Sequence, residues 1–91
     1  MSSDEHRPLP VLPGIREMAE RRRRVVAELA AARRAEGLSQ SAVAAQMGTS
    51  QPVVARLESG QVDVRLSTLS RYAAAVGREL DLRVRAHGGE D

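Results

Sequence analysis

The chain has 91 residues, a formal net charge of +2 and 42% hydrophobic residues, enough for one domain with a small core. It contains no Cys, which excludes a disulfide framework, a thiolate metal site and a thiol nucleophile. No apolar run approaches the roughly 18–20 residues that span a bilayer, and the acidic, Pro-rich start does not have the pattern of a signal peptide. The core must be aliphatic, because there is no Phe or Trp and only one Tyr. A core of this size is marginal for an isolated monomer, so further burial against a partner is plausible.

Residues 1–14 are expected to form a flexible tail, because they hold three of the four Pro residues and show no apolar periodicity. Residues 15–36 follow with apolar side chains at helical spacing, and Gly37 is a suitable C-terminal stop. The run 21-RRRR-24 places four consecutive charges around this helix. We expect it to be a solvated face, with an approach to flanking DNA as the alternative.

Two short helices are predicted next, over residues 40–47 and 51–58. Ser39 or Gln40 is the expected N-cap of the first, and Ser50 is the expected N-cap of the second. The second has a Pro in its first turn, where the missing N–H costs nothing.

A loop over residues 61–66 leads to a further predicted helix over residues 68–76. Ser67 is its expected N-cap and Gly77 its stop. Residues 79–86 alternate strictly between charged and apolar side chains, which predicts a strand. The remaining residues, 87–91, are expected to be a second flexible tail.

The segment 40–60 has what two short helices need in order to cross at a steep angle. These are a small residue where the backbones nearly touch, a Gly in the turn and apolar side chains that close the angle. The sequence supplies them as Val43, Ala44, Met47, Gly48, Val54 and Leu57. The pattern predicts a helix-turn-helix, whose second helix enters the major groove of DNA. An ordinary helical hairpin is the alternative.

The stretches 33-RRAEGLSQSAVAAQMGTSQPVVARLESG-60 and 66-LSTLSRYAAAVG-77 resemble the Cro/repressor (XRE-type) helix-turn-helix family. The resemblance implies a mainly α, lambda-repressor-like bundle of four to five helices over residues 15–78. It also implies that Gln40 contacts a phosphate and braces Gln51, and that Gln51 forks onto an adenine. The chemistry of a Gln amide supports the last point independently, since its donor and acceptor match adenine N7 and N6.

Further contacts to DNA are expected around the second short helix. Base contacts are expected at its outward positions, which are Gln51, Pro52, Val53, Ala55 and Arg56. Phosphate contacts, as in the family, are expected at Gln40, Thr49, Ser50, Ser59, Gln61, Arg65 and Ser67. Pro52 suits a thymine methyl and Arg56 a guanine or a phosphate, with plain surface exposure as the alternative. For the Ser and Thr residues the alternative is local capping. The resemblance further implies a partly buried structural ion pair between Arg33 and Glu58.

The predicted strand has charges in an order that favours pairing with a second copy of itself. One face carries Glu79, Asp81, Arg83 and Arg85, and the other carries Leu80, Leu82, Val84 and Ala86. In an antiparallel pair centred on Leu82, every acidic residue faces a basic one, whereas parallel in-register pairing sets like charges side by side. We therefore expect residues 79–86 to form a ribbon across a homodimer, as in the HipB-like and HigA-like antitoxins of the family. A strand that packs on its own domain or extends as a tail is the alternative.

No catalytic site, cofactor, metal or small-molecule substrate is expected. His6 and His87 lie in the predicted tails, and no predicted element holds either one near a Ser or a carboxylate. The expected partners are double-stranded DNA and a second copy of the chain, with a cognate toxin protein as a further candidate, in the cytoplasm and at the bacterial nucleoid. One alternative is a protein-interaction module that chiefly neutralises a partner toxin, with DNA binding secondary. A purely structural helix-turn-helix is another.

Overall fold

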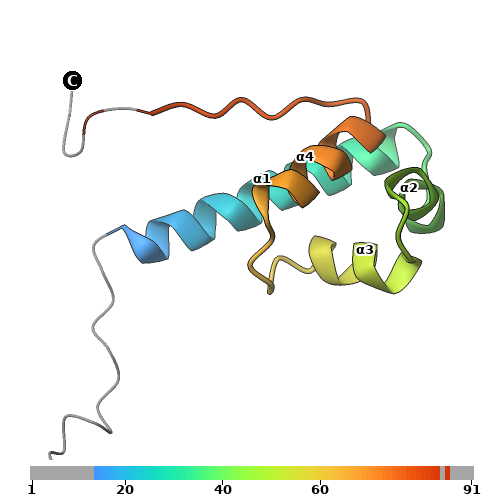
Figure 1. The fold of residues 1–91 in the computed structure, drawn as a ribbon, viewed down its shortest axis with the longest axis horizontal. Coiled ribbons are helices and arrows are strands. Elements are labelled where there is room, and N and C mark those ends of the chain that lie inside the picture. Colours follow the sequence, from blue (N-terminus) through green and yellow to red (C-terminus); the bar gives the residue numbers. More distant parts are fainter. Residues whose placement is uncertain (1–13, 85, 87–91) are drawn as a thin grey trace, which may run out of the picture.

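The computed structural model describes residues 14–84 and residue 86, which fold into four helices and no strand (Figure 1). The helices are α1 (Ile15–Ala35), α2 (Gln40–Met47), α3 (Gln51–Glu58) and α4 (Leu66–Ala75). The predicted mainly α fold is therefore confirmed. The expected tails over 1–13 and 87–91, with His6 and His87, and also Arg85 lie outside the described residues.

The turn after α1 is a Schellman arrangement made possible by Gly37. This glycine has φ +73°, a backbone conformation that other residues rarely adopt. Its N–H donates to the Arg34 carbonyl at 3.0 Å, and the Leu38 N–H donates to the Arg33 carbonyl at 3.1 Å. The Arg33 guanidinium also donates to the Leu38 carbonyl, at 2.8 Å, so the same side chain ties this turn to the interior.

The turn between α2 and α3 is built by local capping. The Ser39 hydroxyl accepts from the Ala42 N–H at 3.0 Å and starts α2, while Gly48 ends it with φ +72°. The Thr49 N–H donates to the Ala44 carbonyl at 2.9 Å, which closes the turn. Ala44 is buried in the same cluster as residues of α3, and its small side chain allows the two helices to cross closely.

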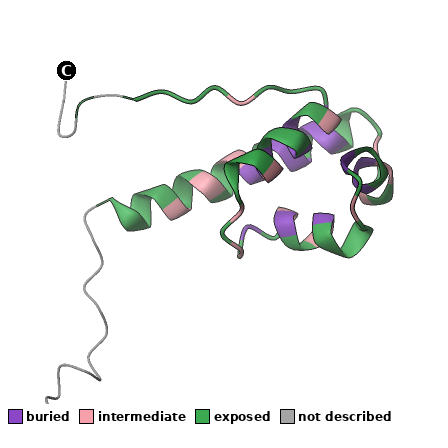
Figure 2. Cartoon of the chain, viewed as in Figure 1, coloured by how far each residue is buried: buried purple, intermediate pink, exposed green. Residues whose placement is uncertain are grey.

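The core collects side chains from all four helices around Tyr72. Its buried members are Val26, Leu29, Ala32, Val43, Ala44, Met47, Val54, Leu57, Leu69, Tyr72, Ala73 and Val76. Figure 2 shows that they gather where the C-terminal half of α1 meets the other helices, whereas the first turns of α1 are exposed. Burial of each Val or Leu side chain contributes about 1.5–3 kcal/mol, and the core thereby fixes α3 on the bundle.

The start of α4 differs from the prediction. Ser67 was expected to be its N-cap, but the helix begins at Leu66 and Arg65 occupies the cap position with extended backbone angles. The Leu69 N–H donates to the Arg65 carbonyl at 2.9 Å, which closes the first turn before Ser67 can act as a cap. A Ser in the sequence does not by itself place the N-cap, because the cap residue must have an extended backbone conformation. Here Arg65 has that conformation, although it offers no capping oxygen.

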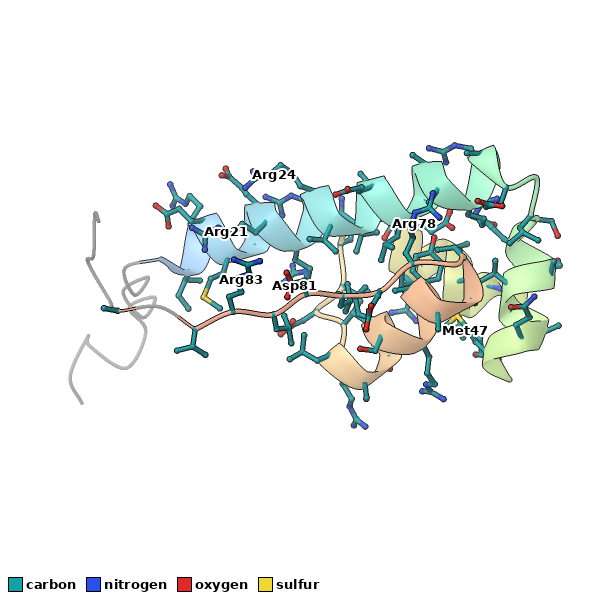
Figure 3. The ribbon with its side chains drawn as sticks, turned by 90° about the horizontal axis from the view of Figure 1, so that it is seen from above. Arg21, Arg24, Met47, Arg78, Asp81 and Arg83 are labelled. Carbon is teal, nitrogen blue, oxygen red and sulfur yellow. The ribbon has the colours of Figure 1, made fainter. Side chains whose placement is uncertain are left out.

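The C-terminal segment runs back from α4 beside α1 (Figures 1 and 3). Residues 79–84 pair with no strand among the described residues, so the predicted strand is not formed there. Leu80 packs against the core, whereas Leu82 is 67% exposed. Among the described residues no helix, including the 21-residue α1, is both long and apolar enough to cross a membrane.

Candidate nucleic-acid interface

The N-terminal end of α3 projects an exposed polar tip. Gln51, Pro52 and Val53 are exposed, and so is Ser50, whose side chain makes no capping hydrogen bond. The opposite face of the helix is buried through Val54 and Leu57. The helix therefore holds its first turn outward on a rigid support, which is how a recognition helix is presented to a groove.

Gln51 is tied to the first residue of α2. Its Nε2 donates to Oε1 of Gln40 at 2.6 Å, and Nε2 of Gln40 donates to Oε1 of Glu58 at 2.9 Å. Gln51 remains exposed while Gln40 is half-buried. The chain of hydrogen bonds thus runs from the interior of the bundle to the tip of α3 and restricts the rotamers of the Gln51 amide.

The inner end of this chain is a cluster around Glu58. Arg33 donates to its carboxylate through Nε at 2.6 Å and through Nη2 at 3.1 Å, a bidentate pair between α1 and α3. The Tyr72 hydroxyl, on α4, donates to the same carboxylate. Four elements of the bundle therefore meet at one carboxylate, because Gln40 of α2 is its remaining donor.

The cluster keeps Glu58 charged. Burial acts to raise the pKa of Glu58, but the hydrogen bonds from Arg33, Tyr72 and Gln40 outweigh it and hold that pKa below its usual range. The hydrogen bond to Glu58 raises the pKa of Arg33 in turn. Burial and the hydrogen bond to the Glu58 carboxylate raise the pKa of Tyr72, so its hydroxyl stays a donor at neutral pH.

An open groove of about 310 Å³ lies between α3 and the start of α4. Arg56 and Arg65 both line it, together with Val53 and Thr68. Three of the residues that the sequence assigned to DNA therefore line one groove: Val53 and Arg56, assigned to bases, and Arg65, assigned to phosphates. Asp63 also lines the groove, but its carboxylate lies 3.4 Å from Nη1 of Arg22.

The hydroxyl and amide residues assigned to phosphates lie around this surface in different local settings. Ser50, Gln61 and Ser67 are exposed and Thr49 is half-buried. The Ser59 hydroxyl donates to the Arg56 carbonyl at 2.6 Å and accepts from the Gln61 N–H at 3.2 Å. Ser59 therefore takes part in capping the end of α3, which is the alternative given for this class of residue.

The arginine run of α1 lies mainly in solvent. Arg21, Arg23 and Arg24 are exposed, whereas Arg22 is half-buried and pairs with Asp63 in the loop before α4. The stem of Arg23 packs beside the turn that ends α3, since a Cβ added to Gly60 would lie 3.1 Å from its Cγ. The run therefore supports the loops next to α3 in addition to supplying charge.

Two residues of this region did not emerge from the sequence. Thr68 was read only as part of a helix, although it lines the groove with Arg56 and Arg65. Tyr72 also falls within that predicted helix with no role assigned to it, yet its hydroxyl is a donor to Glu58. The available signal for Tyr72 was its place as the only aromatic residue on an apolar helix face, since a buried Tyr hydroxyl needs a partner. Among the described residues, no group of His, Asp and Glu is arranged to hold a metal ion.

Comparison with known proteins identifies the family to which these residues belong. Residues 29–82 match the helix-turn-helix family. Antitoxin HigA1 of Mycobacterium tuberculosis, from strains CDC 1551 / Oshkosh and ATCC 25618 / H37Rv, is 46% identical over 76 residues, which are 84% of this chain and 48% of that protein. An uncharacterized HTH-type transcriptional regulator of Haemophilus influenzae is 35% identical over 58 residues, which are 64% of this chain and 59% of that protein.

The chain thus spans about half the length of the mycobacterial relatives that it matches. No solved structure matches it. The family match covers more than half of the chain and includes all of α2, α3 and α4. The chain belongs to the XRE-type helix-turn-helix family.

Proposed function

We propose that the chain is a sequence-specific regulator of transcription that binds double-stranded DNA with α3 in the major groove, most simply as a repressor. The observation that carries the proposal is the Gln51 amide, which is exposed at the tip of α3 and held there by Gln40. An amide in this position can bond the edge of an adenine. Membership of the helix-turn-helix family supports the same docking geometry.

Contacts to the DNA backbone would surround this tip. Arg56, one turn after Pro52, and Arg65 across the groove provide positive charge on the same surface. The hydroxyl of Ser50, which makes no capping hydrogen bond, and the half-buried Thr49 lie at the turn that leads into α3. Contacts of this kind fix the register of a protein on the duplex but carry no sequence information, which leaves discrimination to Gln51 and its neighbours.

A second copy of the chain would complete the DNA-binding unit. In the C-terminal segment, Nη2 of Arg83 lies 3.2 Å from Oδ2 of Asp81, and both side chains are exposed on one face. Two apolar residues of the segment, Leu82 and Val84, are 67% and 101% exposed. Antiparallel pairing of two such segments would set Asp81 opposite Arg83 of the other copy and would bury apolar area of Leu82 and Val84.

The surface beside this segment suits the same interface. An apolar groove of about 490 Å³ lies between α1, the start of α4 and the C-terminal segment, near Arg21 (Figure 3). Its apolar lining is Met18, Val25, Val64, Leu66, Leu69, Leu80 and Leu82. Met18 is 61% exposed and Leu66 is 57% exposed, so both have apolar area to bury. A two-fold dimer formed here would read a pseudo-palindrome with half-sites about one helical turn apart.

A toxin partner is a second candidate, favoured by the 46% identity to a protein named antitoxin HigA1. Under this second candidate function the chain would repress its own operon and would also bind a toxin. Toxin binding would therefore come in addition to DNA binding. Co-expression with the product of the neighbouring reading frame tests it. Co-purification at a fixed ratio is the expected result, and separate elution of the two proteins would remove this candidate.

Selection of bound duplexes from a random library tests DNA binding itself. At low salt we expect enrichment of two related half-sites that each contain an adenine. Affinity for the enriched site should fall by about 10³–10⁵-fold between roughly 50 and 200 mM salt if the dimer makes about 6–10 phosphate contacts. A library that emerges unenriched would contradict the proposal, and binding without sequence preference would reduce it to non-specific association.

A further inference from the structure

We infer that Glu58 is a positioning residue that makes Gln51 select adenine over guanine. The inference rests on the proposed function, because it explains how one side chain of the proposed reading surface would discriminate bases. Glu58 itself is buried at the end of α3, with a side chain only 8% exposed, and makes no contact with DNA in this account. Its effect passes through Gln40.

The first step is the orientation of Gln40. An ionised carboxylate only accepts hydrogen bonds, so any side chain that bonds it must present a donor. The Glu58 carboxylate is held in the ionised form by the bidentate Arg33 and by the Tyr72 hydroxyl. Gln40 must therefore turn its NH₂ group toward Glu58, which it does at 2.9 Å. Its carbonyl oxygen is then the atom that faces Gln51.

The second step is the orientation of the Gln51 amide, which Gln40 fixes in the same way. The Gln40 oxygen has no proton to donate, so Gln51 must present its own NH₂ group, and the two atoms lie 2.6 Å apart. A flipped Gln51 amide would set two oxygens against each other. One N–H of Gln51 is thereby committed to Gln40, which leaves one N–H and the carbonyl oxygen for the DNA.

This outward pattern of one donor and one acceptor distinguishes the purines. Adenine presents an acceptor at N7 and a donor at N6, which match it. Guanine presents acceptors at N7 and O6, so the Gln51 oxygen would face another oxygen. A Gln51 with two free N–H groups would lose this preference, because both could be donated to guanine.

Two variants separate this role from simple support of the fold. Gln40→Met removes both hydrogen bonds that link Glu58 to Gln51 but leaves the Arg33–Glu58 pair in place. Glu58→Gln reverses the polarity when its amide oxygen keeps the bonds from Arg33 Nε and Tyr72: its NH₂ group then takes the Oε1 position, where it faces Gln40 and gives up the bond from Arg33 Nη2. Gln40 must then accept, and its NH₂ group turns toward the oxygen of Gln51. Both N–H groups of Gln51 would then be free for guanine.

The experiment measures the ratio of affinities for the selected duplex and for the same duplex with the contacted A·T pair changed to G·C. For the wild type we expect adenine to be favoured by about 5- to 150-fold. Gln40→Met should bring the ratio close to one, and Glu58→Gln should bring it to one or below. Gln61→Met, at an exposed Gln assigned to phosphate, is the matched control and should weaken both duplexes equally.

Circular dichroism identifies the folded variants, and Gln40→Met decides the question if Glu58→Gln unfolds. Folded variants that keep the wild-type ratio would overturn the inference and leave the proposed function standing. A wild type that binds neither duplex would remove the proposed function, and this inference with it. A uniform loss of affinity at an unchanged ratio would assign Gln40 to the phosphate contact alone.

Discussion

Arg33 and Glu58 meet inside the bundle, with Nε of the arginine 2.6 Å from Oε2 of the carboxylate. One residue lies in the last turn of α1 and the other ends α3, so the pair joins the long helix to the proposed recognition helix. The side chains are 11% and 8% exposed. Water therefore screens this pair far less than the exposed pair between Arg83 and Asp81, and its loss should have measurable consequences.

Replacement of Arg33 by Met should lower the free energy of unfolding by about 3–5 kcal/mol, because it leaves a buried carboxylate without its cation. Urea unfolding followed by circular dichroism measures the change. The double variant Arg33→Met, Glu58→Met should be less destabilised than the sum of the two single variants. Additive losses would show that the two side chains do not interact in solution.

The stability of the bundle should depend on pH through Glu58. The folded pKa of this carboxyl lies below its ordinary value of 4.5, so the folded state favours the ionised form. This contribution to stability is complete above pH 4.5 and is lost as pH falls from there through the folded pKa. Unfolding free energies measured across this acid range should fall more steeply in the wild type than in Glu58→Gln. If the unfolding free energies of the wild type and of Glu58→Gln fell in parallel with pH, this role of Glu58 in stability would be contradicted.

Replacement of Ala44 by Leu should destabilise the chain by about 1–3 kcal/mol or more, since α2 and α3 leave no room for a larger side chain there. Ala44 is 2% exposed. Its neighbour Ala45 lies on the same helix but is exposed, so Ala45→Leu is the matched control and should change stability little. Thermal unfolding compares the two variants. Equal melting temperatures would mean that the helices do not cross at Ala44.

A reversal of charge in the C-terminal segment tests the proposed dimer. Asp81→Arg sets like charges opposite each other in an antiparallel pair and should weaken self-association, while the swap Asp81→Arg, Arg83→Asp should restore it. Sedimentation equilibrium measures the dissociation constant of each form. Arg71→Asp, at an exposed position of α4, serves as the control. A wild type that sediments as a monomer at all concentrations, or a swap that fails to restore association, would contradict the pairing.

Local signals predicted most of the fold, because capping and glycine chemistry act within a few residues. Ser39 caps α2, and Gly37 and Gly48 end helices with positive φ, as their positions in the sequence indicated. The start of α4 at Leu66 was missed, since Arg65 adopts the cap conformation without a capping side chain. The expected strand over 79–86 needs a second chain, so a single chain leaves it as a prediction.

The candidate site was only partly predictable, for a similar reason. The positions of Gln40 and Gln51 follow from the helix-turn-helix pattern, and their contact follows from the family resemblance. The convergence of Arg33, Gln40 and Tyr72 on Glu58 depends on how all four helices pack. No spacing along the chain encodes the direction of the hydrogen bonds that result. The direction of these hydrogen bonds follows from the packed structure, in which all three side chains surround the Glu58 carboxylate and must donate to it.

The affinity of Gln51→Ala for the selected duplex tests the central claim most directly. Fluorescence anisotropy at fixed low salt should show a loss of about 5- to 150-fold relative to the wild type, the equivalent of roughly 1–3 kcal/mol for a contact to a base. Gln46→Ala removes an exposed Gln at the far end of α2 and should bind as the wild type does. A Gln51→Ala variant that binds the duplex as tightly as the wild type would contradict the account.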